Sequence, residues 1–161
     1  MLFHIAKIKD EIVDQVIAIV DKNKEQFSDV SSGTTTENGF QSSNIVNIFD
    51  NNLKKEMLDN QCLYQDVYHI HYIEYFNQGF QRKHNHFTSE EYSFILYLND
   101  SVGDTIFSDR KISPKKGLLI IFDSSLDHAA EKSINKKVLV GAIKQKDILE
   151  TSELPYRKII E

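Results

Sequence analysis

The stretch LYQDVYHIHYIEYF, residues 63–76, alternates between two faces in a way that decides the fold class. One face carries Tyr68, Ile70, Tyr72 and Phe76, and the other carries Val67, His69, His71, Ile73 and Tyr75. A period of two is typical of a β-strand, and aromatic and β-branched residues favour strands. We therefore predict a long strand here. The stretch YSFILYL, residues 92–98, is apolar on both faces and predicts a second, central strand.

The first 60 residues have helical periodicity instead. From Asp10, which suits an N-cap, apolar residues recur at spacings of three and four, namely Ile12, Val13, Val16, Ile17 and Val20. Residues 28–44 are polar and contain glycine, so they predict a long loop. Residues 45–58 predict a second helix, with Ile48, Phe49, Leu53 and Met57 in its apolar stripe.

Short strands are predicted after residue 100, at residues 105–107, 118–122 and 138–143. Helices followed by several short strands favour an α+β fold built on a β-sandwich or a small barrel. We expect a single domain over residues 1–161, with a helical part at 1–60 and a strand core at 62–145.

Composition excludes several classes of protein. The chain has 161 residues, 24 acidic and 19 basic, so its formal net charge of -5 makes a nucleic-acid partner unlikely. The single cysteine, Cys62, excludes an internal disulfide framework and a zinc site built on several thiolates. Neither a targeting segment nor an apolar run long enough to span a membrane is visible, so we expect a cytoplasmic protein without a membrane partner.

Histidines are the candidate metal ligands, since five of the six fall between residues 69 and 128. His84 and His86 share one face if the chain is extended there, and His128 follows 42 residues later. Three protein ligands leave positions open for substrate or oxygen, and imidazole suits iron, zinc, copper or nickel. By itself the H-x-H pair is also compatible with two surface histidines.

The order of motifs around these histidines is more specific. The chain has YFNQGFQRKHNH from Tyr75, then YSFILYLND, GDTIF, SPKKGLLIIFDSSLDH and KKVLVGAI. This order resembles the iron(II)/2-oxoglutarate-dependent dioxygenases of the prolyl 4-hydroxylase type, over about residues 67–145. The resemblance implies a double-stranded β-helix, a jelly-roll or cupin-like barrel, with the N-terminal helices packed on the sheet. It also implies iron(II) and 2-oxoglutarate as cofactors.

The same resemblance assigns roles to individual residues. His84 and His128 match two of the iron ligands, whereas His86 stands where the family has its carboxylate ligand. Lys137, nine residues after His128, matches the cation that pairs with the far carboxylate of 2-oxoglutarate, and Lys136 is expected to face the other way. Tyr97 and Tyr75 match further contacts to the co-substrate.

The function implied is a hydroxylase of a peptidyl or small-molecule substrate. Two alternatives stay open, a metal-binding cupin and a catalytically degenerate binding module. His86 stands in the place of the family's carboxylate ligand. The substitute carboxylate ligands to consider are Glu90, Glu91 and Asp104. His69 and His71 form a second pair on one face, which either lines the metal cavity or belongs to a half-buried face of the sheet, and we favour the half-buried face.

Overall fold

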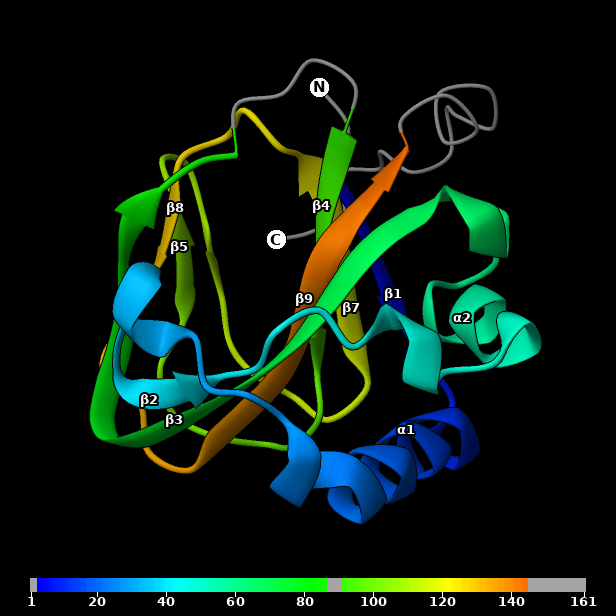
Figure 1. The fold of residues 1–161 in the computed structure, drawn as a ribbon. Coiled ribbons are helices and arrows are strands. Elements are labelled where there is room, and N and C mark those ends of the chain that lie inside the picture. The colour runs from blue at the N-terminus through cyan, green and yellow to red at the C-terminus, as the bar shows by residue number, and fades with distance from the viewer. Residues whose placement is uncertain (1–2, 87–90, 145–161) are drawn as a thin grey trace.

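The computed structural model describes residues 3–86 and 91–144 (Figure 1). Within these residues, nine antiparallel strands form one curled sheet in the order β1-β7-β4-β9-β3-β8-β5-β6, with β2 paired to β3. The strands are β1 (Phe3–Lys7), β2 (Thr36–Gln41), β3 (Val67–His84), β4 (Glu91–Tyr97), β5 (Thr105–Phe107), β6 (Lys111–Ile112), β7 (Leu118–Asp123), β8 (His128–Ala130) and β9 (Lys136–Lys144). The predicted α+β double-stranded β-helix is confirmed.

β3 joins the two halves of the barrel. Its first half pairs with β9, from Val67 opposite Ile143 to Tyr75 opposite Lys136. Its second half pairs with β8, where His84 lies opposite His128. The predicted strand is therefore confirmed, and it continues to His84. This continuation carries the H-x-H segment to the start of β8.

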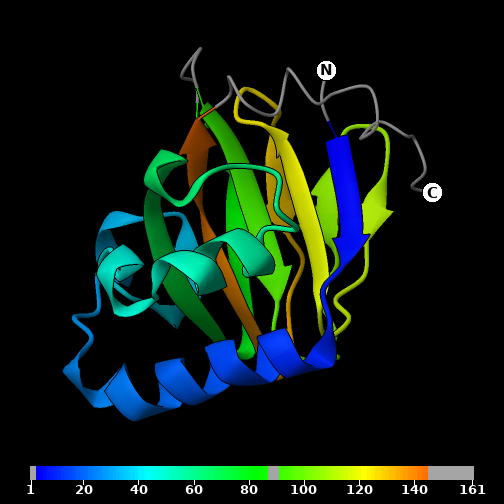
Figure 2. The same ribbon diagram turned by 90° about the vertical axis from the view of Figure 1, so that its right-hand side faces the viewer.

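Two apolar cores lie on the two sides of the sheet. The outer core packs the helices α1 (Asp10–Asn23) and α2 (Asn51–Met57) on the sheet, as Figure 2 shows. The inner core fills part of the barrel interior and includes Ile73, Tyr75, Tyr97, Phe122 and Val138. Neighbours on β9 divide between them, since Val138 belongs to the inner core and Leu139 to the outer one. The parity of a position along a strand thus decides which core its side chain enters.

The N-terminal region differs from its prediction in three places. The expected loop over 28–44 contains β2, whose pairing with β3 is interrupted by a bulge near Asn38, a residue with a positive φ of 53°. The expected helix over 45–58 begins only at Asn51, because Asp50 caps it by accepting a hydrogen bond from the Leu53 amide at 2.8 Å. Asp10 is the first residue of α1 instead of its cap.

Three strands had no prediction: β1, β6 and β8. β1 pairs with β7 at one end of the sheet order, and β6 and β8 span two and three residues. β1 lies in the part of the chain that was predicted to be helical, and β6 and β8 are strands because the tertiary fold supplies their pairing partners. No helix among the described residues has the length and apolar character that crossing a membrane requires.

Close packing of β3 against β9 depends on Gly141. A Cβ atom at this position would lie 2.1 Å from the carbonyl oxygen of His69 and 2.6 Å from the ring of Phe94. Backbone cannot yield to such an overlap, so only glycine fits. The contact fixes β3 at the point where it bears His69 and His71.

Candidate metal centre

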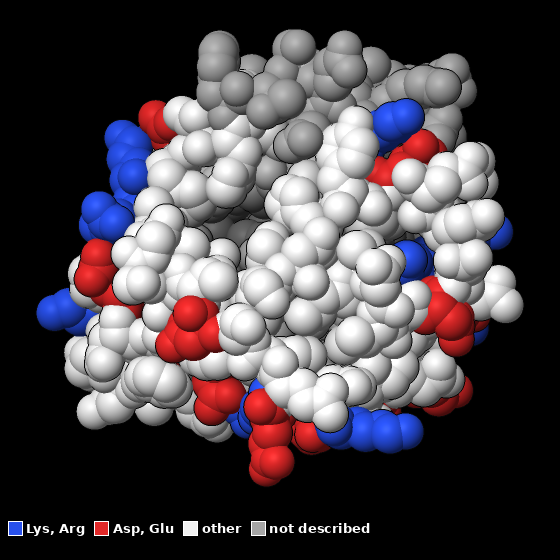
Figure 3. All heavy atoms as spheres, viewed as in Figure 1, with Lys and Arg blue, Asp and Glu red and all other residues white. Residues whose placement is uncertain are grey.

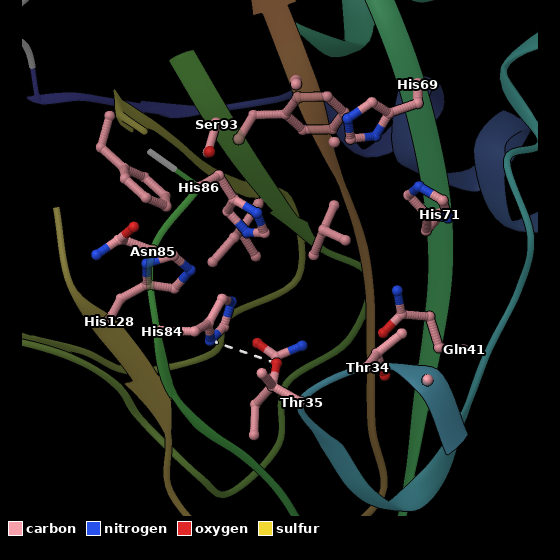
Figure 4. Close-up of a pocket in the computed structure, with 18 residues that line it drawn as sticks. Thr34, Thr35, Gln41, His69, His71, His84, Asn85, His86, Ser93 and His128 are labelled. Atoms are coloured by element: carbon pink, nitrogen blue, oxygen red, sulfur yellow. Dashed lines mark hydrogen bonds between the residues drawn. The ribbon is translucent and has the colours of Figure 1, made fainter. Parts of the chain in front are cut away.

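Three histidines from separate parts of the chain converge at one end of the barrel (Figure 4). His84 ends β3, His86 follows it, and His128 begins β8. One side-chain nitrogen from each of the three lies within 4.8 Å of the others. The rings of His84 and His128 are 4.3 Å apart between centroids, and His86 lies 4.9 Å from His84. Among the described residues, these histidines form the one group of three or more side chains placed to hold a metal ion.

Backbone carbonyls fix the orientation of two of these rings. His84 donates from Nδ1 to the carbonyl of Arg82 at 2.7 Å, and His128 donates from Nδ1 to the carbonyl of Leu126 at 3.1 Å. A carbonyl only accepts, so Nδ1 carries the proton and Nε2 keeps its lone pair. This is how proteins orient imidazoles that bind metals. The backbone amide of His86 donates to the carbonyl of Ser124 at 2.8 Å, which ties the third residue to the segment after β7.

The surroundings keep the three rings neutral. Burial lowers the pKa of His128 to about 4, and its ring packs on Phe122 and Phe107 at 4.9 and 5.9 Å between centroids. His86 is more open to solvent, yet desolvation within the cluster and the neighbouring His84 lower its pKa to about 4 as well. Burial also lowers the pKa of His84. Neutral imidazoles are the form that coordinates a metal.

A buried lysine lies deeper in the barrel. Lys136 is 2% exposed, and its Nζ donates to the carbonyl of Gly103 at 2.9 Å. The ammonium group lies over the rings of Tyr75 and Tyr97, 5.0 and 5.9 Å from their centroids. The hydroxyl of Tyr97 is hydrogen-bonded to that of Thr105. These side chains form a cationic, hydroxyl-bearing site inside the barrel.

The charge of Lys136 is not balanced by an ion pair. Across residues 3–86 and 91–144, no carboxylate forms a salt bridge with it. Burial lowers its pKa to about 8, and this effect outweighs the opposing influence of Asp104 and Glu131. A buried cation held by one carbonyl is energetically costly unless an anion joins it.

Lys137 does not occupy the place expected for it. It lies opposite Glu74 in the pairing of β3 with β9, and the two charges interact, which contributes to lowering the pKa of Glu74. Lys137 therefore faces the outside of the barrel, and its expected inward orientation is wrong. Lys136 points inward because it shares its parity on β9 with Val138 of the inner core. The two adjacent lysines are distinguished only by the register of β9 on β3.

The histidine cluster opens into a cavity of about 350 Å³. A narrower space of about 10 Å³, room for about one water molecule, continues past His128 to Lys136. Both spaces are bordered by Gln81, Ile95, His128 and Val140, so they are adjacent. Figure 3 shows this face of the molecule hollowed, with a surround that is mostly neither acidic nor basic. A ligand that extends from the histidines to Lys136 would have to widen the narrow part.

The remaining candidates divide between this cavity and the surface. His69 and His71 line the cavity, so the favoured interpretation of this pair, a half-buried face of the sheet away from the metal, is replaced by the alternative. Asp104 accepts a hydrogen bond from Ser113 and does not belong to the histidine group. Glu90 lies outside the described residues, as does the side chain of Glu91.

Comparisons with solved structures agree with this architecture. The fold matches a prolyl 4-hydroxylase from Pseudomonas putida, with a TM-score of 0.63 and 15% identity over 89% of this chain and 92% of that one. It matches a prolyl hydroxylase from Trichoplax adhaerens in complex with a hypoxia-inducible-factor peptide, with a TM-score of 0.63 and 11% identity over 94% and 87% of the two chains. It also matches HygX from Streptomyces hygroscopicus, with nickel, 2-oxoglutarate and hygromycin B bound. The TM-score is 0.62 and the identity 8%, over 96% of this chain and 84% of that one.

These likenesses show that the chain has the fold of 2-oxoglutarate oxygenases over most of its length. No protein-family model matches the sequence, and no curated protein matches it either. The identities of 8–15% carry no information on activity, which has to be argued from the site itself.

Proposed function

We propose that the protein is an iron(II)/2-oxoglutarate-dependent oxygenase that hydroxylates a peptidyl or small-molecule substrate. The single observation that carries this proposal is the buried ammonium group of Lys136, which pairs with no carboxylate of the described residues. It lies inside a barrel whose mouth holds three convergent imidazoles. A metal-binding protein without an anionic co-substrate would gain nothing from a cation buried at this cost. A dicarboxylate that reaches from the metal to Lys136 would account for both features.

The residues present fit the metal. His84 and His128 offer Nε2 lone pairs held in place by backbone carbonyls, and His86 completes a set of three. Such a site leaves coordination positions open, and imidazole is a suitable ligand for iron(II). With His86 in place of a carboxylate, none of the candidate ligands within residues 3–86 and 91–144 brings a negative charge to the metal. An anionic co-substrate that chelates the metal would supply that charge.

The residues present also fit the co-substrate. Lys136 would pair with the far carboxylate of 2-oxoglutarate. The hydroxyl of Tyr75, and whichever of the mutually hydrogen-bonded hydroxyls of Tyr97 and Thr105 keeps its proton free, would donate to its oxygens. Burial raises the pKa of both tyrosines, so their hydroxyls keep the protons that they would donate. Lys137 has no part in this assignment because it faces the outside of the barrel.

Iron(II) with 2-oxoglutarate and dioxygen supplies the oxidation of an unactivated C–H bond, which no side chain can perform. The protein's contribution is position and the exclusion of water. Phe107 and Phe122 pack on the ring of His128 and make the inner side of the centre apolar. The cavity of about 350 Å³ on its open side would admit the substrate. The peptide held by the Trichoplax enzyme and the hygromycin B held by HygX are examples of the two substrate classes.

The proposal is tested by turnover of 2-oxoglutarate in the absence of substrate. The full chain is loaded with iron(II) under anaerobic conditions, exposed to oxygen and assayed for succinate. We expect slow succinate formation that is lost in His128→Ala, which removes a metal ligand, and in Lys136→Met, which removes the cation. Lys137→Met is the matched control, and we expect it to form succinate like the wild type. Equal rates in all four proteins, or no iron binding by the wild type, would contradict the proposal.

A further inference from the structure

The face of the cavity opposite the metal centre carries a second set of polar side chains, His69, His71 and Gln41, which we call the distal face. His69 and His71 lie on β3 and Gln41 ends β2. Figure 4 shows the two imidazoles pointing into the cavity from the side opposite His84 and His128. Their ring centroids are 5.0 Å apart. A group bound between the two sets would therefore lie beside the metal centre.

The hydrogen-bonding capacity of the distal face is only partly used by the protein. His71 donates from Nδ1 to the carbonyl of Ser42 at 2.9 Å, which leaves the lone pair of Nε2 free in the neutral ring. The ring of His69 forms no hydrogen bond with a described residue, and its Nδ1 is buried without a partner. Gln41 accepts from Thr36 through Oε1, so its amide N–H groups remain available. Buried polar groups normally have partners, and their shortage here points to a ligand.

The lining of the cavity carries no formal charge. Among its described residues there is no Asp, Glu, Lys or Arg. The nearby basic residue Arg82 points away, since it pairs with Glu37 at 2.9 Å and donates to the carbonyl of Thr34. An ionic group entering here would lose its water without gaining a counter-ion, whereas an uncharged polar group would exchange water for equivalent hydrogen bonds.

We propose that His69 and His71 bind an uncharged, hydrogen-bonding group of the substrate, an amide or a hydroxyl, whose N–H or O–H donates to Nε2 of His71. Gln41 would donate to the acceptor oxygen of an amide bound in this way. The inference rests on the proposed function in one respect, because it treats the group bound here as part of the molecule to be oxidised. The binding of that group itself requires no metal.

Three probes with the same carbon chain separate the possible charges: butyramide, butyrate and butylammonium. Each is titrated into the metal-free full chain, and the imidazole ¹H–¹⁵N signals of the histidines are followed by NMR. We expect butyramide to shift the signals of His69 and His71 and to bind more tightly than the two ions.

Two variants test the residues. Because the ring of His69 has no hydrogen-bond partner within the described part of the chain, His69→Phe should fold as well as the wild type while weakening butyramide binding about fivefold. His71→Phe should weaken it at least as much. His4→Gln is the matched control, since His4 lies outside the cavity and contacts Asp59, and it should bind butyramide like the wild type.

The outcomes separate this inference from the proposed function. Selective butyramide binding that is lost in both variants supports the distal face, even if the protein never binds iron. Tighter binding of butyrate or butylammonium, or unchanged butyramide binding in folded His69→Phe and His71→Phe, overturns the inference. It does so whether or not the wild type turns over 2-oxoglutarate.

Discussion

Replacing Lys136 by methionine should stabilise the protein at neutral pH while it weakens binding of the co-substrate. The fall in the pKa of Lys136 from 10.5 to about 8 corresponds to about 3 kcal/mol, at about 1.4 kcal/mol per pH unit. That free energy opposes folding whenever the lysine is protonated. Methionine has a similar shape and carries no charge, so it relieves this cost. It also removes the hydrogen bond to the carbonyl of Gly103, worth about 1 kcal/mol.

The net expectation is a gain of about 2 kcal/mol at pH 7, which would raise the urea midpoint by about 1 M. The sign of the pH dependence follows from proton linkage. Between about pH 8 and pH 10.5 the unfolded lysine holds a proton that the folded one has lost, so the stability of the wild type rises with pH in this window. The variant lacks this rise, and its advantage should vanish by about pH 10.5.

The assay is urea unfolding of the wild type and Lys136→Met at several values between pH 7 and pH 10.5, with 2-oxoglutarate affinity measured by calorimetry on the metal-loaded proteins. Loss of a charge-assisted hydrogen bond should weaken 2-oxoglutarate at least about tenfold. Lys137 lies on the opposite side of the same strand. Lys137→Met should therefore change neither the rise in stability between about pH 8 and pH 10.5 nor the affinity for 2-oxoglutarate. A variant less stable than the wild type at pH 7, with a stability difference independent of pH, would refute the argument that the buried charge is uncompensated.

Two further predictions concern the metal centre and the scaffold behind it. His86→Asp should keep iron(II) in an anaerobic titration because a carboxylate is an equally suitable ligand, whereas His86→Ala should weaken iron binding at least about tenfold. Equal iron affinities of both variants and the wild type would show that His86 is not a ligand. Gly141→Ala should lower the free energy of unfolding by more than about 2 kcal/mol because its Cβ would overlap the His69 carbonyl. Gly33→Ala, where a Cβ meets nothing within 4 Å, is the control and should be nearly neutral. Similar urea midpoints for the two variants would contradict the packing argument.

The amount of the fold that could be predicted depended on the length of each element. The alternation over residues 63–76 and the apolar run at 92–98 each predicted a strand that the structure contains. In a long segment, the pattern of apolar residues is enough to indicate the secondary structure. The strands β2 and β8 could not be predicted in the same way. β2 is polar and bulged, and β8 has three residues, so both depend on pairing with β3.

The candidate site was also predictable only in part from the sequence. The H-x-H spacing does not by itself single out His84 and His86, because His69 and His71 have the same spacing. The order of motifs around the histidines pointed to His84, His86 and His128, and the fold brings these three together. The inward orientation predicted for Lys137 belongs to Lys136 in the structure. Lys136 and Lys137 have the same chemistry and adjacent places in the sequence, and nothing local distinguishes them.

The sequence by itself determined the α+β class and the long strand that organises the barrel through periodicity, and it pointed to the three histidines through the order of the motifs around them. Only the tertiary structure decided which lysine enters the barrel and that His69 and His71 face the metal centre. Both depend on the register between β3 and β9, in which Tyr75 lies opposite Lys136 and His71 opposite Val140. Strand register is fixed by contacts between distant segments, and a shift of one residue turns every side chain to the other face.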